Sequence, residues 1–427
     1  MKKNKHVIVI SYDAFSKDNW ESAKKKPHLA KLIAKGASTT QVRSVYPTLT
    51  YVIHSSYVTG AYPNKHGVFH NNPFQPFVPV DDQDWHWYRD VIKLPTIYEA
   101  ATAKGLKTAS NLWPVTGKAK IDYNIPEMKA VRGENQALKV LKNGSKLYSA
   151  MMELKFGKLR DGIKQPNLDD FTTACAVETI KKKKPHLLLT HLIDLDEHKH
   201  HHGTKAEIIE DVIERMDNRI GQIVHATYEA GIADETTFII IGDHGQLDVH
   251  YKVYLNRLFK DNGLIYEENG EMHWRAYVQS ADGSAYLHVK ENDTEAKDFA
   301  LKLLEEASNQ SKYGIEAIYN RSQLEQFHVE DKFEYMLEAK AGYAFANEHD
   351  KEVIVDLHEN GERHATHGYS PYKKGYTSNL IITGPGVKTN YQLKEANVVD
   401  LAPTIAHILE LDFKAVDGRA LTEVFED

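Results

Sequence analysis

Short apolar runs alternate along the chain with longer segments in which apolar residues recur every three or four positions. The short runs are typical of strands buried on both faces of a sheet, and the periodic segments are typical of amphipathic helices. Their alternation predicts βαβ units, and therefore an α/β fold with a mostly parallel central sheet and helices on both faces. The expected strands are His6–Tyr12, Lys107–Trp113, His186–Ile193, Thr236–Ile241 and Asn379–Thr383.

The clearest helix is expected at Lys205–Ala230. Six apolar residues form a single stripe there: Ile209, Val212, Ile213, Met216, Ile220 and Ile223. Further helices are predicted for Pro27–Lys35, Thr96–Lys104, Asp169–Ile180 and Val398–Leu409, and Lys181–Lys184 for the solvated last turn of the third of these.

The pattern loosens between Val249 and Ala365. This stretch mixes short strands, polar turns and one helix near Thr294–Ala307, and a strong strand pattern returns after it. We therefore expect residues 1–248 and 366–427 to form one catalytic core, with residues 249–365 inserted as a cap or substrate lobe.

Composition excludes several classes of function. The chain of 427 residues has a formal net charge of −7, which argues against a nucleic acid polymer as partner. No apolar run is long enough for a signal peptide or a membrane span, so we expect no membrane partner and a cytoplasmic location. The single cysteine, Cys175, excludes an internal disulfide and a thiolate zinc site. Nothing in the pattern indicates an oligomeric state.

Polar residues that could carry chemistry stand where expected strands end, which is where ligands bind in open α/β sheets. Asp13 follows the first strand, Thr50 lies at the expected start of a helix, and Asp243-His244 stands between two glycines after a buried strand. Taken alone, Asp13 and Thr50 would more often be helix caps. The adjacent Asp243 and His244 have little structural reason to be there.

The segment His191–Gly203 reads H-L-I-D-L-D-E-H-K-H-H-H-G and contains two Asp-x3-His pairs, Asp194 with His198 and Asp196 with His200. In a helix, residues four apart lie on one face, as two ligands of one metal require. The run of three histidines could equally form a solvated, adventitious metal-binding patch. Two zinc sites need about six to eight ligands, and the strand ends supply that number without any cysteine.

These motifs together resemble the nucleotide pyrophosphatase/phosphodiesterase branch of the alkaline phosphatase superfamily over nearly the full chain. They comprise Asp13, Thr50-Tyr51-x-x-His54, Val58-Thr59-Gly60, Pro63-x-x-His66-Gly67, His70-Asn71, Trp113-Pro114, Asp196-x3-His200-x2-Gly203, Asp243-His244-Gly245, His367-Gly368 and the tail Asp400–Ile405. The family's glycine spacing selects Asp196 and His200 over Asp194 and His198.

The resemblance implies an alkaline phosphatase-like fold with two zinc ions, one of which manganese or iron could replace. One ion would be held by Asp13, Thr50, Asp243 and His244, and the other by Asp196, His200 and His367. Thr50 would be the nucleophile and would form a covalent phospho-threonine. Asn71 would bind a phosphate oxygen, and Tyr51, Asn71 and Trp113 would contact the substrate. No ligand role is implied for His54, His198, His201, His202 or His364.

The chain departs from the family pattern at Val52-Ile53, where Pro-Asn is usual, and at Tyr51, where Phe is frequent. The implied function is a two-zinc phosphodiesterase or nucleotide pyrophosphatase that hydrolyses a small phosphorylated substrate such as a nucleotide. One alternative is a phosphomonoesterase or a phosphonoacetate hydrolase-like phosphonatase of the same superfamily. A distant alternative is a non-catalytic zinc-binding protein built on the histidine cluster.

Overall fold

The computed structural model describes residues 5–329, 333–359, 361–362, 364–414 and 417–426. Among these residues the largest sheet has nine strands, in the order β18-β2-β17-β6-β1-β5-β3-β4, with β19 also paired to β2. The strands are β1 His6–Tyr12, β2 Ala37–Arg43, β3 Thr108–Trp113, β4 Tyr123–Pro126, β5 Leu187–Leu192, β6 Thr236–Ile241, β17 Ser378–Thr383, β18 Tyr391–Gln392 and β19 Ala396–Asn397.

The central strand β1 runs parallel to both of its neighbours, β5 and β6. Among the described strands of this sheet, only β17, between β2 and β6, runs antiparallel to the strands beside it. Alternate side chains of β1 enter different cores, with Val7 and Val9 on one face and Ile8 and Ile10 on the other. The expected α/β class with a mostly parallel sheet is confirmed.

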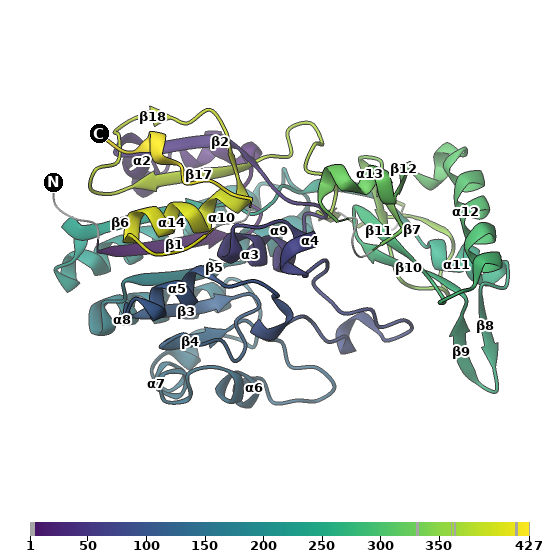
Figure 1. Cartoon of the computed structure of the whole chain (residues 1–427), viewed down its shortest axis with the longest axis horizontal. Coiled ribbons are helices and arrows are strands. Elements are labelled where there is room, and N and C mark those ends of the chain that lie inside the picture. The colour runs from purple at the N-terminus through teal and green to yellow at the C-terminus, as the bar shows by residue number, and fades with distance from the viewer. Residues whose placement is uncertain (1–4, 330–332, 360, 363, 415–416, 427) are drawn as a thin grey trace.

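Helices cover both faces of this sheet (Figure 1). Those on one face are α3 Thr50–Thr59, α5 Ile97–Ala103 and α14 Leu401–Leu409; those on the other are α2 Pro27–Ala34, α8 Asn167–Lys183 and α10 Ile208–Ala230. The apolar stripe of α10 is buried as predicted. This helix begins three residues later than expected, and Val398–Asp400 forms a 3-10 turn ahead of α14 instead of part of it.

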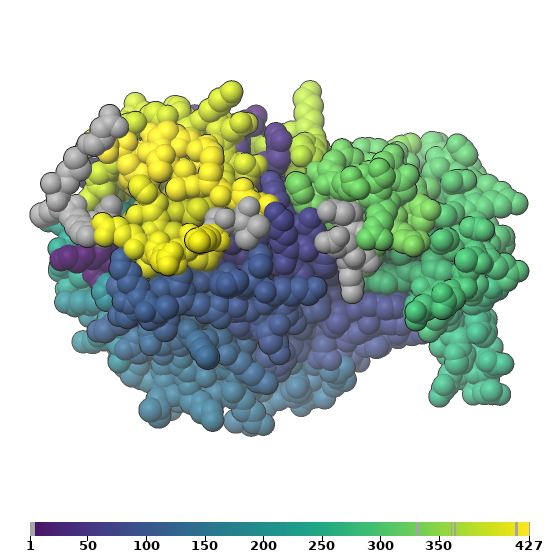
Figure 2. All heavy atoms as spheres, viewed as in Figure 1, coloured from purple at the N-terminus to yellow at the C-terminus, as the bar shows by residue number. Residues whose placement is uncertain are grey.

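The described residues between 247 and 366 build three smaller sheets, which project to the right of the core in Figures 1 and 2. Their strands are β7 Leu247–Val253, β8 Ile265–Glu268, β9 Glu271–Trp274, β10 Ala276–Ala281, β11 Ser284–Val289, β12 Ile315–Asn320, β13 Tyr335–Ala339, β14 Gly342–Phe345, β15 Ile354–Asp356 and β16 His364–Thr366. Helices α11 Leu255–Asp261, α12 Thr294–Ser308 and α13 Arg321–Leu324 belong to the same region.

The chain leaves and re-enters the core along one strand pair, because β7 and β16 are antiparallel partners with Val249 opposite His364. The boundaries proposed at residues 249 and 365 each fall inside one of these two strands. The division into core and lobe stays a proposal.

Two helices, α6 Gln136–Asn143 and α7 Lys146–Phe156, lie beyond the edge strand β4, at the lower margin of Figure 1. Further helices are α1 Trp20–Ala23, α4 Pro63–His66 and α9 Asp194–His202. In the described part of the chain, no helix has the length and apolar character needed to cross a bilayer.

Candidate metal centre

The candidate residues meet at the carboxyl end of the central strands. Asp13 directly follows β1, and β5 leads into α9, which carries Asp196 and His200. Asp243 and His244 follow β6, Thr50 is the first residue of α3, and His367 follows β16. Parallel neighbours end at the same edge of a sheet, so three adjacent strands deliver their side chains to one place.

A first group surrounds the ring of His244. Its Nε2 atom lies 3.2 Å from Asp13 Oδ1, 3.4 Å from Asp243 Oδ2 and 3.4 Å from Thr50 Oγ1. Atoms bound tetrahedrally to zinc at its usual bond lengths are about 3.3 Å apart. The spacing of the first group therefore fits a single ion between these atoms.

In each of the two carboxylates of the first group, one oxygen accepts hydrogen bonds and the other has no hydrogen-bond partner among the described residues. Asp13 Oδ2 accepts from His191 Nε2 at 3.1 Å, and Asp243 Oδ1 accepts from the backbone N–H of Ala14 and of His244. Asp13 Oδ1 and Asp243 Oδ2 are buried without a hydrogen-bond partner among the described residues. A bare buried carboxylate oxygen is strongly unfavourable unless a cation is present.

Electrostatics lead to the same conclusion. Burial raises the pKa of Asp13 well above its usual value, and repulsion from Asp196 and Asp243 adds to the shift. Three carboxylates converge in a place that solvent barely reaches, so the site has the charge and the shape of a cation-binding centre.

A second group consists of Asp196, His200 and His367, whose candidate ligand atoms all lie within 4.8 Å of one another. His200 Nδ1–H donates to the carbonyl oxygen of Ala365 at 2.7 Å, and His367 Nδ1–H donates to that of Thr48 at 2.8 Å. These bonds orient both rings and leave Nε2 of each free for a metal.

The pKa of His200 is shifted by its surroundings. Burial would lower its pKa, but Asp196 Oδ2, 3.2 Å from His200 Nε2, raises it to about 9. The ring of His367 stacks on that of His244 with centroids 3.9 Å apart, so the second group adjoins the first.

The competing pair on α9, Asp194 and His198, does not join either ligand group. Asp194 is buried and accepts from Arg215 at 2.8 Å and from Arg219 at 2.6 Å, and His198 lies beside it. The structure brings Asp196 and His200 to the centre and keeps Asp194 in this ion-pair network. The three consecutive histidines do not converge either, because His201 is exposed and contacts Glu197.

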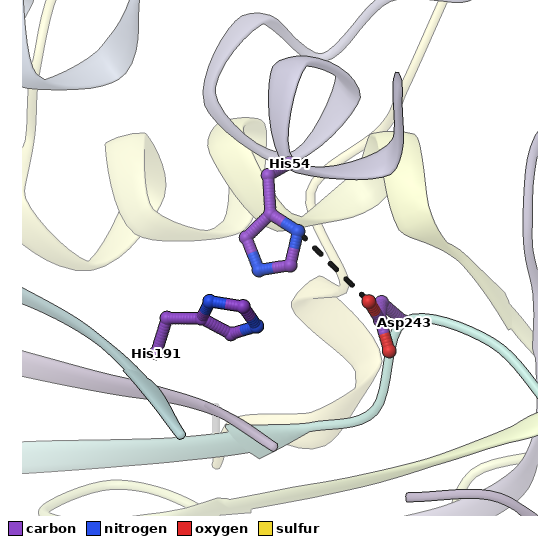
Figure 3. A group of neighbouring side chains, drawn as sticks. All are labelled: His54, His191 and Asp243. Atoms are coloured by element: carbon purple, nitrogen blue, oxygen red, sulfur yellow. Dashed lines mark ion pairs between the residues drawn. The ribbon is translucent and has the colours of Figure 1, made fainter. Parts of the chain in front are cut away.

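His54, His191 and Asp243 form a third cluster of potential ligands, which shares Asp243 with the first group (Figure 3). His54 Nδ1 lies 4.0 Å from Asp243 Oδ2, but its N–H donates to the carbonyl oxygen of Thr50 at 2.7 Å. Its Nε2 accepts from the Ser11 hydroxyl at 2.9 Å. Burial lowers the pKa of His54 well below its usual value, so the ring is neutral and fully engaged as a support for Thr50.

Sequence reasoning missed two residues of the site, His191 and Glu127. His191 lies inside β5 and bridges Asp13 to Glu127, whose Oε2 is 2.7 Å from His191 Nδ1. Burial lowers the pKa of His191, but the two carboxylates raise it well above its usual value. Glu127 directly follows β4, so it obeys the same strand-end rule as Asp13; the four-residue strand gave too short a pattern to show it.

Lys199 was also missed. It is fully buried on α9, and its ammonium group donates to Ala14 O at 2.8 Å, to Asn19 Oδ1 at 2.9 Å and to Ser16 Oγ at 3.3 Å. These bonds anchor the segment that follows Asp13 to the helix that carries Asp196. These bonds therefore fix the first and second ligand groups relative to each other.

A cavity of about 380 Å³ opens onto both groups. Tyr51 and Asn71 line it, and Asn71 Oδ1 accepts from the Tyr51 backbone N–H at 2.9 Å, which leaves the amide nitrogen of Asn71 for a ligand. Tyr51 packs edge-on against Trp85, also in the wall. The far wall is contributed by α6, α7 and the segment after them, and it mixes aliphatic side chains such as Val140 and Leu141 with polar ones such as Ser149 and Glu153.

Trp113 is a correction to the expected substrate contacts. Its side chain is fully buried in the core, where its ring meets those of His54 and Tyr57, and it is not part of the cavity wall. No surface of Trp113 is left for a substrate, so we do not keep it in the site.

Residues 7–370 match the family model of type I phosphodiesterase/nucleotide pyrophosphatase. The chain belongs to this family. Among curated family members, venom phosphodiesterase 2 of Crotalus adamanteus is 24% identical over 252 residues, which cover 57% of this chain and 27% of the venom protein. This chain therefore aligns with about a quarter of that relative. The bis(5′-adenosyl)-triphosphatase enpp4 of Mus musculus is 25% identical over 414 residues, covering 95% of this chain and 77% of the relative.

Solved structures of the family share the fold. Human ectonucleotide pyrophosphatase/phosphodiesterase 5 superposes with a TM-score of 0.71 at 18% identity, covering 99% of this chain and all of that chain. A murine counterpart, an inactive variant with a threonine replaced by alanine, was solved in complex with AMP, with a TM-score of 0.70 at 17% identity and coverage of 99% and 100%. The alkaline phosphatase-like fold expected from the sequence is confirmed.

Proposed function

We propose that this chain is a two-metal phosphodiesterase/nucleotide pyrophosphatase in which Thr50 attacks phosphorus. The observation that supports this most directly is the pair of bare, buried oxygens, Asp13 Oδ1 and Asp243 Oδ2, placed with Thr50 Oγ1 around one ring nitrogen of His244. A site built only for stability would not leave them unpartnered.

The residues present fit two ions. Asp13, Thr50, Asp243 and His244 would hold one, and Asp196, His200 and His367 the other. Zinc suits these nitrogen and carboxylate ligands, and manganese or iron could replace it at one site. When bound, the ions would lower the pKa of the Thr50 hydroxyl and offset the negative charge of the phosphate.

Thr50 is placed to act as the nucleophile. It stands at the first position of α3, where the helix dipole favours an anion, and its hydroxyl faces the cavity. Its Oγ would form a bond to phosphorus while the bond from phosphorus to the leaving oxygen breaks. Water would then attack the same phosphorus and release Thr50 unchanged. The amide nitrogen of Asn71 would donate to a phosphate oxygen as negative charge builds there.

The cavity supports a substrate with a sizeable organic group. Its volume exceeds what phosphonoacetate or inorganic phosphate would fill, and Tyr51, Trp85 and Trp87 give it aromatic surface on one side. A nucleotide is one such substrate, in keeping with the AMP complex of the murine relative. These features argue against phosphonoacetate as the substrate, and the preference for a diester over a monoester rests on the match to the phosphodiesterase family.

Metal content tests the centre directly. We expect about two zinc ions per chain after dialysis, measured by mass spectrometry. Asp243→Ala should lower the content by one, because it removes a ligand of the first group. The matched control is the double variant His201→Ala/His202→Ala, which should keep both ions. A control that loses its zinc while Asp243→Ala retains it would favour the histidine-cluster alternative.

A substrate panel tests the reaction. Zinc-loaded protein should hydrolyse bis-p-nitrophenyl phosphate and a nucleotide ester faster than p-nitrophenyl phosphate, with no turnover of phosphonoacetate. Preference for phosphonoacetate would replace the phosphodiesterase proposal by the phosphonatase alternative. Absence of turnover on every compound, with two ions bound, would contradict both.

A further inference from the structure

The exposed aliphatic side chains of the protein are concentrated in one segment. Among the described residues, five of the six exposed leucine, isoleucine and valine side chains lie between residues 138 and 163: Leu138, Leu147, Leu154, Leu159 and Ile163. Leu147 and Leu154 are 90% and 88% exposed. They are seven residues apart on α7 and therefore share one face of that helix. Such a concentration marks an interaction surface.

The same segment is strongly basic. Residues 138–164 contain seven lysines and arginines against two acidic residues, in a chain whose net charge is −7. Five of the lysines are exposed: Lys142, Lys146, Lys155, Lys158 and Lys164. Lys155 and Lys164 pair with Glu178 and Asp161, whereas Lys142, Lys146 and Lys158 have no carboxylate partner within the described ranges. A segment that carries both exposed aliphatic side chains and unpaired ammonium groups suits a surface that is apolar inside and anionic outside.

We propose that α6, α7 and the segment up to Lys164 form a docking surface for an anionic lipid bilayer. Leu147 and Leu154 would enter the boundary between headgroups and acyl chains, and the unpaired lysines would contact the anionic headgroups. This surface lies at the lower edge of the core in Figures 1 and 2, on the side opposite β18, and is independent of the reaction proposed above. The expectation of no membrane partner rested on the absence of a spanning segment, which peripheral docking does not require.

The proposed docking surface lies next to the cavity of the candidate active site. Ile163 belongs both to the exposed surface and to the cavity wall, and Val140 and Leu141 of α6 line the cavity from the same side. The cavity therefore reaches the surface next to the docking residues. A docked protein would hold its candidate active site at the lipid boundary.

A second copy of this chain fits the same surface less well. Closed dimers form by placing the same patch of two subunits face to face. The unpaired Lys142, Lys146 and Lys158 would then face their own counterparts, and like charges brought together at an interface oppose association. An anionic bilayer complements both the charge and the apolar tips.

Co-sedimentation with lipid vesicles tests the proposal on the 427-residue chain. Vesicles of phosphatidylcholine with about 30% phosphatidylserine should bind the protein, and pure phosphatidylcholine vesicles should bind it much more weakly. Raising the salt from about 0.1 M to about 0.5 M should weaken binding, because screening shortens the reach of the lysines. The double variant Leu147→Ser/Leu154→Ser should lower the partition coefficient at least about tenfold. Lys142→Glu/Lys146→Glu/Lys158→Glu should lower it about 100-fold, since each lysine contributes about fivefold.

Matched controls lie on other surfaces. Tyr228→Ser/Tyr266→Ser removes exposed apolar groups from α10 and β8, and Lys25→Glu/Lys35→Glu/Lys302→Glu makes the same charge change elsewhere. Both controls should bind vesicles as the unmodified protein does. All variants alter exposed side chains, so their thermal unfolding should be unchanged.

Three results would overturn the proposal. The unmodified protein could bind anionic and neutral vesicles equally weakly. The controls could lose as much binding as the variants of the 138–164 segment. Sedimentation equilibrium could show a dimer that Leu147→Ser/Leu154→Ser dissociates, and the surface would then be a subunit interface.

Discussion

The candidate metal centre and the α6–α7 wall of the same cavity are built in opposite ways. The centre is buried and polar, and its side chains come from strand ends where backbone and neighbouring groups fix nearly every atom. The wall is partly exposed and mixes aliphatic with polar side chains, and it comes from two helices outside the sheet. Bond formation at phosphorus tolerates little displacement of the reacting groups, whereas a wall that only encloses the organic group of a substrate needs the right shape. We therefore expect substitutions in the centre to affect turnover and substitutions in the wall to affect substrate choice.

Thr50→Ala should have the largest effect. It removes the proposed nucleophile, so activity should fall by at least about 1,000-fold, while Asp13, Asp243 and His244 still bind the first ion. Thr50→Ser keeps the oxygen and should retain appreciable turnover. The matched control is Ser55→Ala on the same helix, whose hydroxyl bonds only the Tyr51 carbonyl at 2.7 Å. The test is to measure, for each variant, the steady-state rate on the best substrate of the panel together with the metal content. Equal activity of Thr50→Ala and Ser55→Ala would remove Thr50 from the mechanism.

His200→Ala should have the second-largest effect. Activity should fall by about 100-fold or more, because the substitution removes a ligand of the second group. His198→Ala is the control two residues away. It leaves Asp194 bound to Arg215 and Arg219, so both folding and activity should be nearly unchanged. Zinc content and kcat, measured together, separate loss of the metal from loss of the fold. If His198 proves to be the essential residue, the choice between the two Asp-x3-His pairs is wrong.

Glu127→Gln should lower kcat about tenfold with both ions retained. The amide keeps the shape of the side chain but cannot balance the charge of His191, which positions Asp13. Glu153→Gln is the control, because Glu153 lines the same cavity from α7 and is paired with Arg160 instead. Glu127→Asp should restore part of the rate. A shift of the pH–rate profile in Glu127→Gln, absent in Glu153→Gln, would distinguish positioning of Asp13 from a general loss of structure.

Val140→Phe should have the smallest effect and the opposite kinetic signature. Val140 is half-buried in the cavity wall, and a larger side chain there narrows the space for the organic group. KM for the bulkiest diester should rise a few fold, with kcat within about twofold of the unmodified value. The small substrate p-nitrophenyl phosphate should be hydrolysed as before. A fall in kcat on every substrate would mean that the wall and the centre are not separable.

Much of the fold is visible in the sequence because burial on a single element leaves a local pattern. β1 and β6 have the bounds that their apolar runs predicted, and the stripe of α10 is buried as its spacing required. The strand-end positions of Asp13 and Asp243 were readable for the same reason. Where a pattern is short, this reasoning fails: β4 has four residues, so Glu127 behind it went unnoticed.

The sequence by itself determined the fold class, the family and the residue types of the centre, since those depend on periodicity and on motifs within short segments. Only the tertiary structure decided that His191 links Asp13 to Glu127, that Trp113 is buried away from the cavity, and that α6 and α7 close its far side. Each of these depends on which distant segments the strand order places side by side. That order is set by the packing of the whole sheet, and no local pattern records it.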